Sequence, residues 1–116
     1  MEYKIEFHTP KESVDAIREA LIESGVGKLG NYDSIMAVSE IVGYWRPLPG
    51  SNPKDGVVGD VNRGTIIKME VRCEKELVKK ALNLIKEHHP YEEPLINIIP
   101  LANHEFEEML KKELSG

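Results

Sequence analysis

Along the chain, the spacing of hydrophobic residues changes between the period of a strand and the period of a helix. The order of these changes constrains the fold more than any other sequence feature. Residues 3–7 alternate apolar and charged side chains, which is the period of a half-buried strand. Residues 10–24 instead repeat apolar side chains at helical spacing. Thr9 can cap that helix with its hydroxyl, Pro10 suits its first position, and Gly25 suits the left-handed residue that ends it. The pattern predicts a strand followed directly by a helix.

The same order of strand and helix returns in the second half of the chain. Residues 65–73 alternate again, and residues 74–88 place their apolar side chains on one helical face before Pro90 ends the run. Between the two units, β-branched and aromatic residues over 35–45 predict two strands around a break at Ser39-Glu40, or one bent hairpin.

The C-terminal part adds a strand and a helix, which completes the order β-α-β-β-α-β-α. Residues 95–101 are dense in isoleucine, and Asn103 can cap a helix with the apolar stripe Phe106, Met109, Leu110 and Leu114. Two β-α-β halves with right-handed crossovers predict an α+β ferredoxin-like sandwich, in which a four-stranded antiparallel sheet carries two helices on one face. The last helix can cover part of the other face and a partner subunit the remainder. We therefore expect a single domain over residues 1–116 that forms homo-oligomers.

Composition narrows the classes of partner and compartment. Hydrophobic residues make up 41% of the 116 residues, enough for a core without a disulfide or a structural metal. An excess of acids gives a net charge of -5, which argues against a nucleic-acid partner because phosphates need a basic face. The single cysteine, Cys73, cannot form an internal disulfide and fits the cytoplasm. We find no signal-peptide pattern and no apolar run of membrane length, so we expect no membrane partner.

The segment from Pro47 to Gly64 predicts a long surface loop, because its prolines remove backbone donors and its glycines favour unusual dihedral angles. Loops longer than about 12 to 15 residues in compact domains usually carry function or mobility. Closure over a ligand, contact with a partner and a disordered excursion all remain open for this segment.

The densest group of polar side chains lies between His88 and Pro94, at the expected corner between a helix and a strand. Imidazole and carboxylate groups are good ligands for divalent ions, so His88, His89 and Glu92 are candidate metal ligands. The same segment also fits a structural corner, in which a histidine interacts with the helix dipole and Tyr91 anchors the turn. Both interpretations stay open.

Two further polar groups are candidates for ligand binding. The glycines beside Asn31, Tyr32 and Asp33 can present backbone amides to an anion, although glycine and asparagine also favour tight turns. Trp45 and Arg46 pair the only tryptophan with a planar cation, which suits a ligand cleft or ordinary packing equally. No residue stands in a nucleophile-elbow pattern.

Three motifs follow one another in a characteristic order. Residues 27–33 come first, Trp45-Arg46-Pro47 with Gly50-Ser51-Asn52-Pro53 and Gly56 follow, and His89-Pro90-Tyr91-Glu92-Glu93-Pro94 comes last. From about Gly25 to Leu101 the chain resembles the YqfO-type insert domain of the dinuclear-metal-centre proteins in the NGG-interacting-factor (YbgI-like) family, which also occurs as free-standing short chains. The last motif is also similar to a corner in CutA, whose ferredoxin-like fold is shared with the PII signalling proteins.

The resemblance implies a CutA/PII-like fold and a trimer in which strands or loops extend between subunits. It does not imply the parent family's dimetal site, whose ligands lie outside the insert, and a label such as GTP cyclohydrolase type transfers by name only. Ile66, Lys68 and Asn97 depart from the family pattern, which has an acid, an arginine and an aspartate near these places, so a site built on those groups is not expected here.

We favour a non-enzymatic binding or regulatory module that senses a small ligand or a divalent metal ion at clefts between subunits. The expected ligand-binding residues are Asn31, Tyr32, Asp33, Trp45, Arg46, Asn52, Tyr91 and Glu92. A scaffold domain that docks through the loop over 47–64 is the main alternative, and a metal-assisted hydrolase that uses His88, His89 and Glu92 is another. The favoured hypothesis needs strand pairing to bring the bend near residue 30 beside the corner near residue 90, so that the two form one pocket.

Overall fold

The computed structural model describes residues 1–112, and its elements follow the predicted order. The strands and long helices are β1 (Glu2–Thr9), α1 (Val14–Glu23), β2 (Ala37–Trp45), β3 (Asn62–Glu74), α2 (Lys75–His88) and β4 (Ile96–Pro100). Two 3-10 turns, Lys11–Ser13 and Ala102–Glu105, precede α1 and a short last helix, α3 (Glu107–Leu110). None of these helices is long and apolar enough to cross a lipid bilayer.

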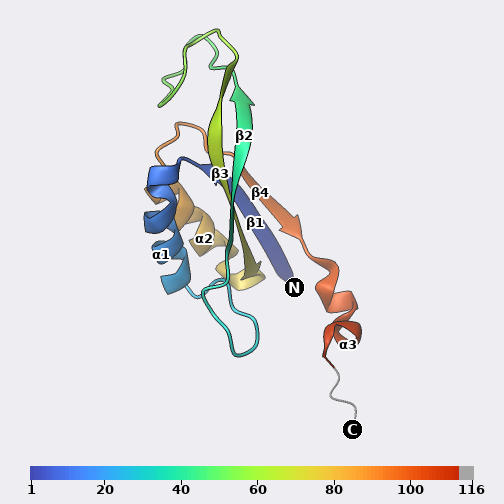
Figure 1. Ribbon diagram of the computed structural model, residues 1–116. Helices are drawn as coiled ribbons and strands as arrows, with labels where there is room; N and C mark the ends of the chain where they lie inside the picture. The colour runs from blue at the N-terminus through green and yellow to red at the C-terminus, as the bar shows by residue number, and fades with distance from the viewer. Residues whose placement is uncertain (113–116) are drawn as a thin grey trace.

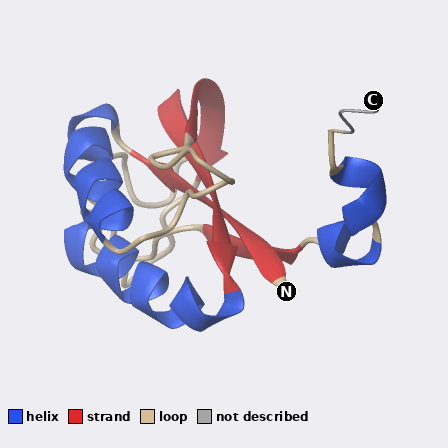
Figure 2. Cartoon of the chain, turned by 90° about the horizontal axis from the view of Figure 1, so that it is seen from below, coloured by secondary structure: helices blue, strands red, loops and turns tan. Residues whose placement is uncertain are grey.

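The four strands form one antiparallel sheet in the order β2-β3-β1-β4, and α1 and α2 lie on one of its faces (Figure 1). The predicted ferredoxin-like α+β fold is thereby confirmed. Strand β1 is central, with Ile5 opposite Val71 on one side and Ile98 on the other. Figure 2 shows the same layers from below, with α3 set apart from the sheet on the side away from α1 and α2.

The core lies between the sheet and the two long helices, where the alternating pattern of the strands places it. Every second residue of β1 from Ile5 and of β3 from Ile67 is buried. Helices α1 and α2 complete the core with the apolar residues Ile17, Leu21, Ala81 and Ile85. The period of two in the strands and the helical spacing in the helices therefore meet at a single apolar interface.

The start of α1 differs from the prediction. Thr9 does not cap the helix, because it is the last residue of β1 and its hydroxyl donates to the Pro10 carbonyl at 3.4 Å. A 3-10 turn follows, with the Ser13 amide donating to the Pro10 carbonyl, and α1 begins only at Val14. Gly25 ends the helix in the predicted left-handed conformation, with a φ of 96°.

The predicted break at Ser39-Glu40 was wrong, because β2 is one continuous strand. It pairs with β3 over nine positions, from Ala37 opposite Glu70 to Trp45 opposite Asn62. The ladder gives Ser39 and Glu40 regular pairing positions, and both side chains are exposed on an edge strand, where polar residues are tolerated.

The expectation that the last helix covers the open face of the sheet was also wrong. Helix α3 has a single turn, and none of its residues is buried. Phe106 and Met109 of the predicted apolar stripe are exposed, and Leu114 lies outside the described residues. The open face gives an apolar helix little reason to bind, because it is charged.

Ion pairs cross the strands on this open face. Lys4 Nζ lies 3.0 Å from Glu70 Oε1, and Arg72 Nη2 lies 2.8 Å from Glu2 Oε1. Asn97 donates from Nδ2 to a Glu6 carboxylate oxygen at 3.1 Å and is the main cause of the lowered pKa of Glu6. The open face is therefore a charged surface, distinct from the apolar core on the other side of the sheet.

The chain is extended because β2 and β3 continue past the end of β1. The radius of gyration is 16.9 Å, against about 13 Å for a compact domain of this length. The last pair of β1 with β3 joins Thr9 to Ile67, so that residues 42–45 and 62–65 form a two-stranded arm (Figure 1). Loop 46–61 closes the tip of this arm.

We expect Phe7→Ala to lower the free energy of unfolding by about 3–5 kcal/mol, because it opens a cavity in a fully buried part of the core. The matched control Tyr32→Ala removes an aromatic ring that is 75% exposed and should change stability by no more than about 0.5 kcal/mol. Urea unfolding followed by circular dichroism measures both. Equal losses in the two variants would contradict this placement of the core.

Candidate functional site

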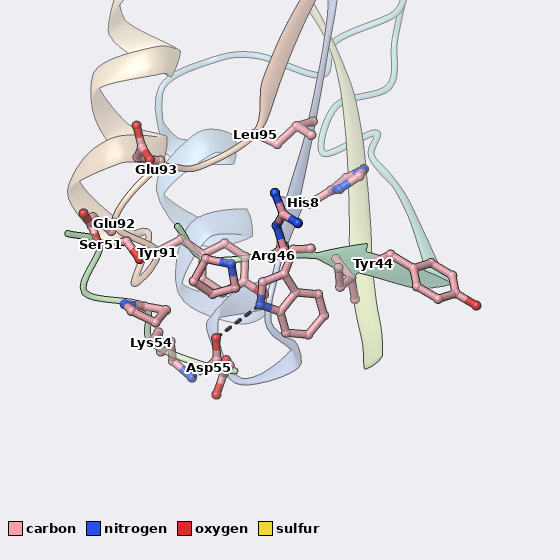
Figure 3. A pocket seen from close by; sticks show the side chains of 14 residues that line it. His8, Tyr44, Arg46, Ser51, Lys54, Asp55, Tyr91, Glu92, Glu93 and Leu95 are labelled. Atoms are coloured by element: carbon pink, nitrogen blue, oxygen red, sulfur yellow. Dashed lines mark hydrogen bonds and ion pairs between the residues drawn. The ribbon is translucent and has the colours of Figure 1, made fainter. Parts of the chain in front are cut away.

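A cavity of about 330 Å³ lies where the arm leaves the sheet, between loop 46–61 and the corner 89–95 (Figure 3). Three aromatic residues, Tyr44, Trp45 and Tyr91, form part of its wall. The remaining lining combines apolar side chains, such as Ile66 and Leu95, with charged ones from the loop and the corner. Sites for small molecules typically mix apolar walls with a few polar groups in this way.

Two glycines opposite each other on the arm make room for neighbouring side chains, Gly64 for Trp45 and Gly43 for Ile66. Gly43 pairs with Gly64, and a Cβ added at Gly64 would lie 3.3 Å from the Trp45 ring. A Cβ at Gly43 would collide with the side chain of Ile66. The Trp45 indole N–H donates to the Asp55 carbonyl at 3.2 Å, which fixes the ring and ties the loop to the arm.

The corner is built around His89, whose two ring nitrogens both bind the backbone. Nε2 donates to the His8 carbonyl at the end of β1, and Nδ1 accepts from the Tyr91 amide at 3.2 Å. This pattern requires the neutral Nε2–H form. The ring is buried against Tyr91, with ring centroids 4.8 Å apart, and burial lowers the pKa of His89. The contacts support the structural interpretation of this histidine.

The predicted metal site of His88, His89 and Glu92 is not formed. His88 is exposed at the end of α2, His89 has no free nitrogen, and the Glu92 carboxylate accepts from the Asn52 amide at 2.6 Å. Within residues 1–112 no three His, Cys, Asp or Glu side chains are placed to hold one ion. Neighbouring residues of the corner point in different directions, which separates groups that lie close together in sequence.

Loop 46–61 lies against the corner and the start of α1 through two polar contacts. One is the hydrogen bond from the Asn52 amide to Glu92, and the other joins Lys54 Nζ to Glu12 Oε1 over 2.9 Å. Within the loop, the Gly59 amide donates to the Pro47 carbonyl at 2.8 Å. The loop is therefore a defined wall of the cavity.

The charged groups of the cavity differ in whether they have a partner. Lys54 lies within 3.4 Å of Asp55 in addition to Glu12, and the hydrogen bond to Glu12 is the main cause of its raised pKa. Arg46 takes part in none of the ion pairs found in residues 1–112, and Figure 3 shows it on the same side of the cavity as His8. Arg46 is thus a cation available to a ligand. Burial, and less strongly the Asp55 carboxylate, raises the pKa of Tyr91.

Within one chain, the bends near residues 30 and 90 do not meet in a shared pocket, contrary to the expectation from strand pairing. The Gly27 amide donates to the Arg72 carbonyl, near the end of β3, whereas His89 binds His8 at the opposite end of the sheet. Helix α1 runs back along β1, so the segment after α1 returns to the end of the sheet where β1 begins. Figure 1 shows this segment, 27–36, at the bottom and loop 46–61 at the top.

The predicted ligand residues therefore fall into two groups. Trp45, Arg46, Tyr91 and Glu92 line the cavity, and Asn52 contacts Glu92 at its edge. The others, Asn31, Tyr32 and Asp33, are exposed at the far end of the sheet. There Leu29 and Tyr32 exchange both backbone hydrogen bonds, at 2.9 and 3.0 Å, which confirms a tight turn.

Sequence reasoning missed several polar groups of the cavity, among them His8, Lys54 and Asp55. Asp55 acts on Trp45 through its backbone carbonyl, for which no side-chain pattern exists. His8 stands alone in the sequence near the end of β1, and the corner packs there because His89 binds the His8 carbonyl. The order of the strands in the sheet would have been needed to place His8 beside the corner 89–95.

Comparisons with known proteins agree with the predicted resemblance, although no family model matches the chain. It is 30% identical over 99 residues to the GTP cyclohydrolase 1 type 2 homolog of Staphylococcus aureus (strain Mu50 / ATCC 700699), which covers 85% of this chain and 27% of that protein. It is 33% identical over 98 residues to the homolog of Bacillus subtilis (strain 168), with 84% and 26% covered. The predicted resemblance is confirmed. The chain spans about a quarter of the length of these curated relatives.

Solved structures agree with this assignment. A Bacillus cereus protein related to NIF3 matches with a TM-score of 0.77 and 27% identity, over 88% of this chain and 26% of that one. CutA of Archaeoglobus fulgidus matches with a TM-score of 0.64 and 21% identity, over 88% and 85% of the two chains. The PII-like protein CutA of Nostoc sp. PCC 7120 matches with a TM-score of 0.66 and 17% identity, over 90% and 85%. The CutA structures show that the fold is shared.

The contacts of His89 predict a dependence of stability on pH. Its pKa is lowered from 6.5 in the folded chain, so below pH 6.5 the unfolded chain binds more protons. Stability is therefore full above that pH and falls as the pH decreases, by at most about 1.4 kcal/mol per pH unit for one histidine. Burial lowers the pKa of His8 in the same direction, so variants must separate the two residues.

We expect His89→Gln to unfold more easily at pH 7, by about 1–3 kcal/mol, because the Tyr91 amide loses its acceptor. The loss of stability between pH 7 and pH 5 should be smaller than in the natural chain. His88→Gln replaces the exposed neighbour and should keep both the stability and its pH dependence. Urea unfolding at several pH values measures this, and an unchanged slope in His89→Gln would contradict the assigned role.

Proposed function

We propose that the chain is a binding or regulatory module that acts as a homo-oligomer and takes a small molecule in the cavity between loop 46–61 and the corner 89–95. The observation that carries this proposal is the arrangement of Arg46, which has no acidic partner among residues 1–112, in one cavity with Trp45 and Tyr91. A cation beside aromatic rings in a confined space binds flat, negatively charged molecules well, because it combines stacking with charge attraction.

The ligand class follows from the size and the charges of the cavity. A volume of about 330 Å³ suits a compact ring compound better than a peptide. The acids Asp55 and Glu92 are already engaged, with Lys54 and with the Asn52 amide. Of the two cations in the lining, Lys54 is paired and Arg46 is not, within residues 1–112, whereas the third acid, Glu93, lies at the rim with Glu92. Arg46 is therefore the cation that can attract a ligand, and we infer a planar ring compound that carries negative charge.

Binding fits the cavity better than catalysis does. Burial raises the pKa of Cys73 to about 11, so its thiol is protonated near neutral pH and is a poor nucleophile. His89 uses both ring nitrogens for the backbone. His8 lines the cavity, but no hydrogen bond of residues 1–112 orients its ring as a general base requires. The buried, reduced Cys73 also agrees with the cytoplasmic location that we propose.

The surface of the chain supports assembly with further copies. Large apolar side chains are exposed on the arm, on its loop and at the C-terminal end of the described residues, among them Val42, Tyr44, Val61, Phe106 and Met109. Exposed apolar groups in such numbers on a small chain usually meet a partner. Proteins of the CutA and PII-like kind have the same fold, and we propose a trimer.

Sedimentation equilibrium tests the assembly. We expect a particle of three times the chain mass of 13.1 kDa at micromolar concentration. Val42→Lys places a charge on the exposed apolar surface of the arm, outside the cavity lining, and should weaken the association, whereas Lys28→Glu in the distant turn should leave it unchanged. A natural chain that sediments as a monomer would contradict the proposed trimer.

Trp45 reports on binding, because it is the only tryptophan and lines the cavity. We expect adenosine monophosphate, a planar ring with a phosphate, to change its emission and to release heat in calorimetry, and adenosine to bind more weakly. Arg46→Gln should weaken the binding of the monophosphate about tenfold, since hydrogen bonds to charged groups contribute about 1.5–3 kcal/mol. Arg18→Gln on α1 is the control with the same loss of charge. No binding at millimolar concentration would contradict the proposed site.

A further inference from the structure

A backbone donor at the edge of the cavity is held by the chain's own carboxylate. The Asn52 amide donates to Glu92 Oε2 over 2.6 Å, and the negative charge of the carboxylate strengthens this hydrogen bond. Both residues are exposed, so water competes for this bond. Glu92 thus occupies a donor that an anion in the cavity can also use.

The turn before Asn52 points this donor in a fixed direction. The Leu48 carbonyl accepts from the Ser51 amide at 3.0 Å and from the Ser51 hydroxyl at 2.6 Å. Gly50 has a φ of 94°, and Pro49 precedes it, as in a type II turn. Pro53 follows and restricts Asn52 to extended conformations. A stiff segment therefore presents the amide, which limits the entropy lost when an anion binds it.

A second contact holds the same loop without using the donor. Lys54 binds Glu12, which lies in the 3-10 turn before α1. Displacement of Glu92 leaves this ion pair in place, and the loop stays attached to the body of the chain. Replacement of Glu92 at the Asn52 amide would thus be a local event at one end of the cavity.

We propose that Glu92 is a built-in competitor that holds the Asn52 amide in the ligand-free chain, and that a phosphate or carboxylate group of the ligand replaces it on binding. This rests on the proposed function and adds the contact that the anionic group makes. Figure 3 shows Glu92 and Ser51 at the end of the cavity away from His8 and Arg46. A ligand that spans the cavity then places its anionic group at Asn52 and its ring beside Trp45 and Tyr91, while the charge of Arg46 attracts the anionic ligand into the cavity.

The competitor has a matched control in its neighbour. Glu92 and Glu93 both line the cavity, but only Glu92 accepts from Asn52. Glu92→Gln removes the charged acceptor, and Glu93→Gln removes the same charge from the same rim. A purely electrostatic effect of the acids on an anion would act alike in both variants, whereas competition for the amide is specific to Glu92.

The test measures the affinity for adenosine monophosphate and for inorganic phosphate by calorimetry and Trp45 emission. Glu92→Gln should tighten the binding of the monophosphate about tenfold, and Glu93→Gln by no more than about twofold. In the ligand-free chain, hydrogen exchange of the Asn52 amide, followed by NMR, should be faster in Glu92→Gln only. A thermal melt of each variant checks that it is folded.

The outcomes separate the two proposals. If the natural chain binds the monophosphate and both variants bind it with equal affinity, Glu92 is no competitor, although the site stands. If both variants bind it more weakly than the natural chain, the cavity prefers a cation. The proposal that an anionic group replaces Glu92 is then wrong. If none of the three chains binds it, the proposed function fails, and the displacement of Glu92 by a ligand fails with it.

Discussion

The antiparallel pairing of β1 with β3 is the constraint on which the rest of the structure depends. Eight residue pairs join the two strands, and their alternation sends Ile5, Phe7 and Met69 into the core while Lys4 and Glu70 form an ion pair on the other face. A shift of one residue in this register would exchange the two sets of side chains. The apolar face for α1 and α2 and the charged open face therefore follow from one ladder.

The unequal lengths of these strands create the place for the cavity. Strand β3 has 13 residues and β1 only 8, so that β2 and β3 continue past Thr9 as a two-stranded arm. On the other side of β1, the ladder with β4 reaches only to Phe7, and the corner 89–95 continues along the end of β1, where the His8 amide donates to the Leu95 carbonyl. His89 holds the corner there, because it binds the His8 carbonyl from the side of α2. The cavity lies between this corner and the arm.

Sequence periodicity predicted the elements and the fold because the same buried apolar residues set the pattern of each element and bring the elements together at one interface. The alternation at Ile67, Met69 and Val71 is visible in sequence for the same reason that it forms a core in space. Thr9 misled the prediction because a capping residue and a strand end have the same local appearance. The proposed meeting of residues 30 and 90 failed for a different reason, since spatial proximity depends on the direction in which α1 returns along the sheet.

The corner motif combines residues that hold the corner itself with a residue that contacts the neighbouring loop. His89 and the Tyr91 backbone face inward and bind each other, whereas Glu92 faces outward and binds the loop. A chain that reverses direction within a few residues has to alternate in this way, because successive side chains point to different sides. The inward residues make the corner rigid, and that rigidity gives Glu92 a fixed position opposite the stiff turn at Gly50. A single hydrogen bond between two exposed groups gains its directional precision from these two rigid supports, and it can break without disturbing either of them.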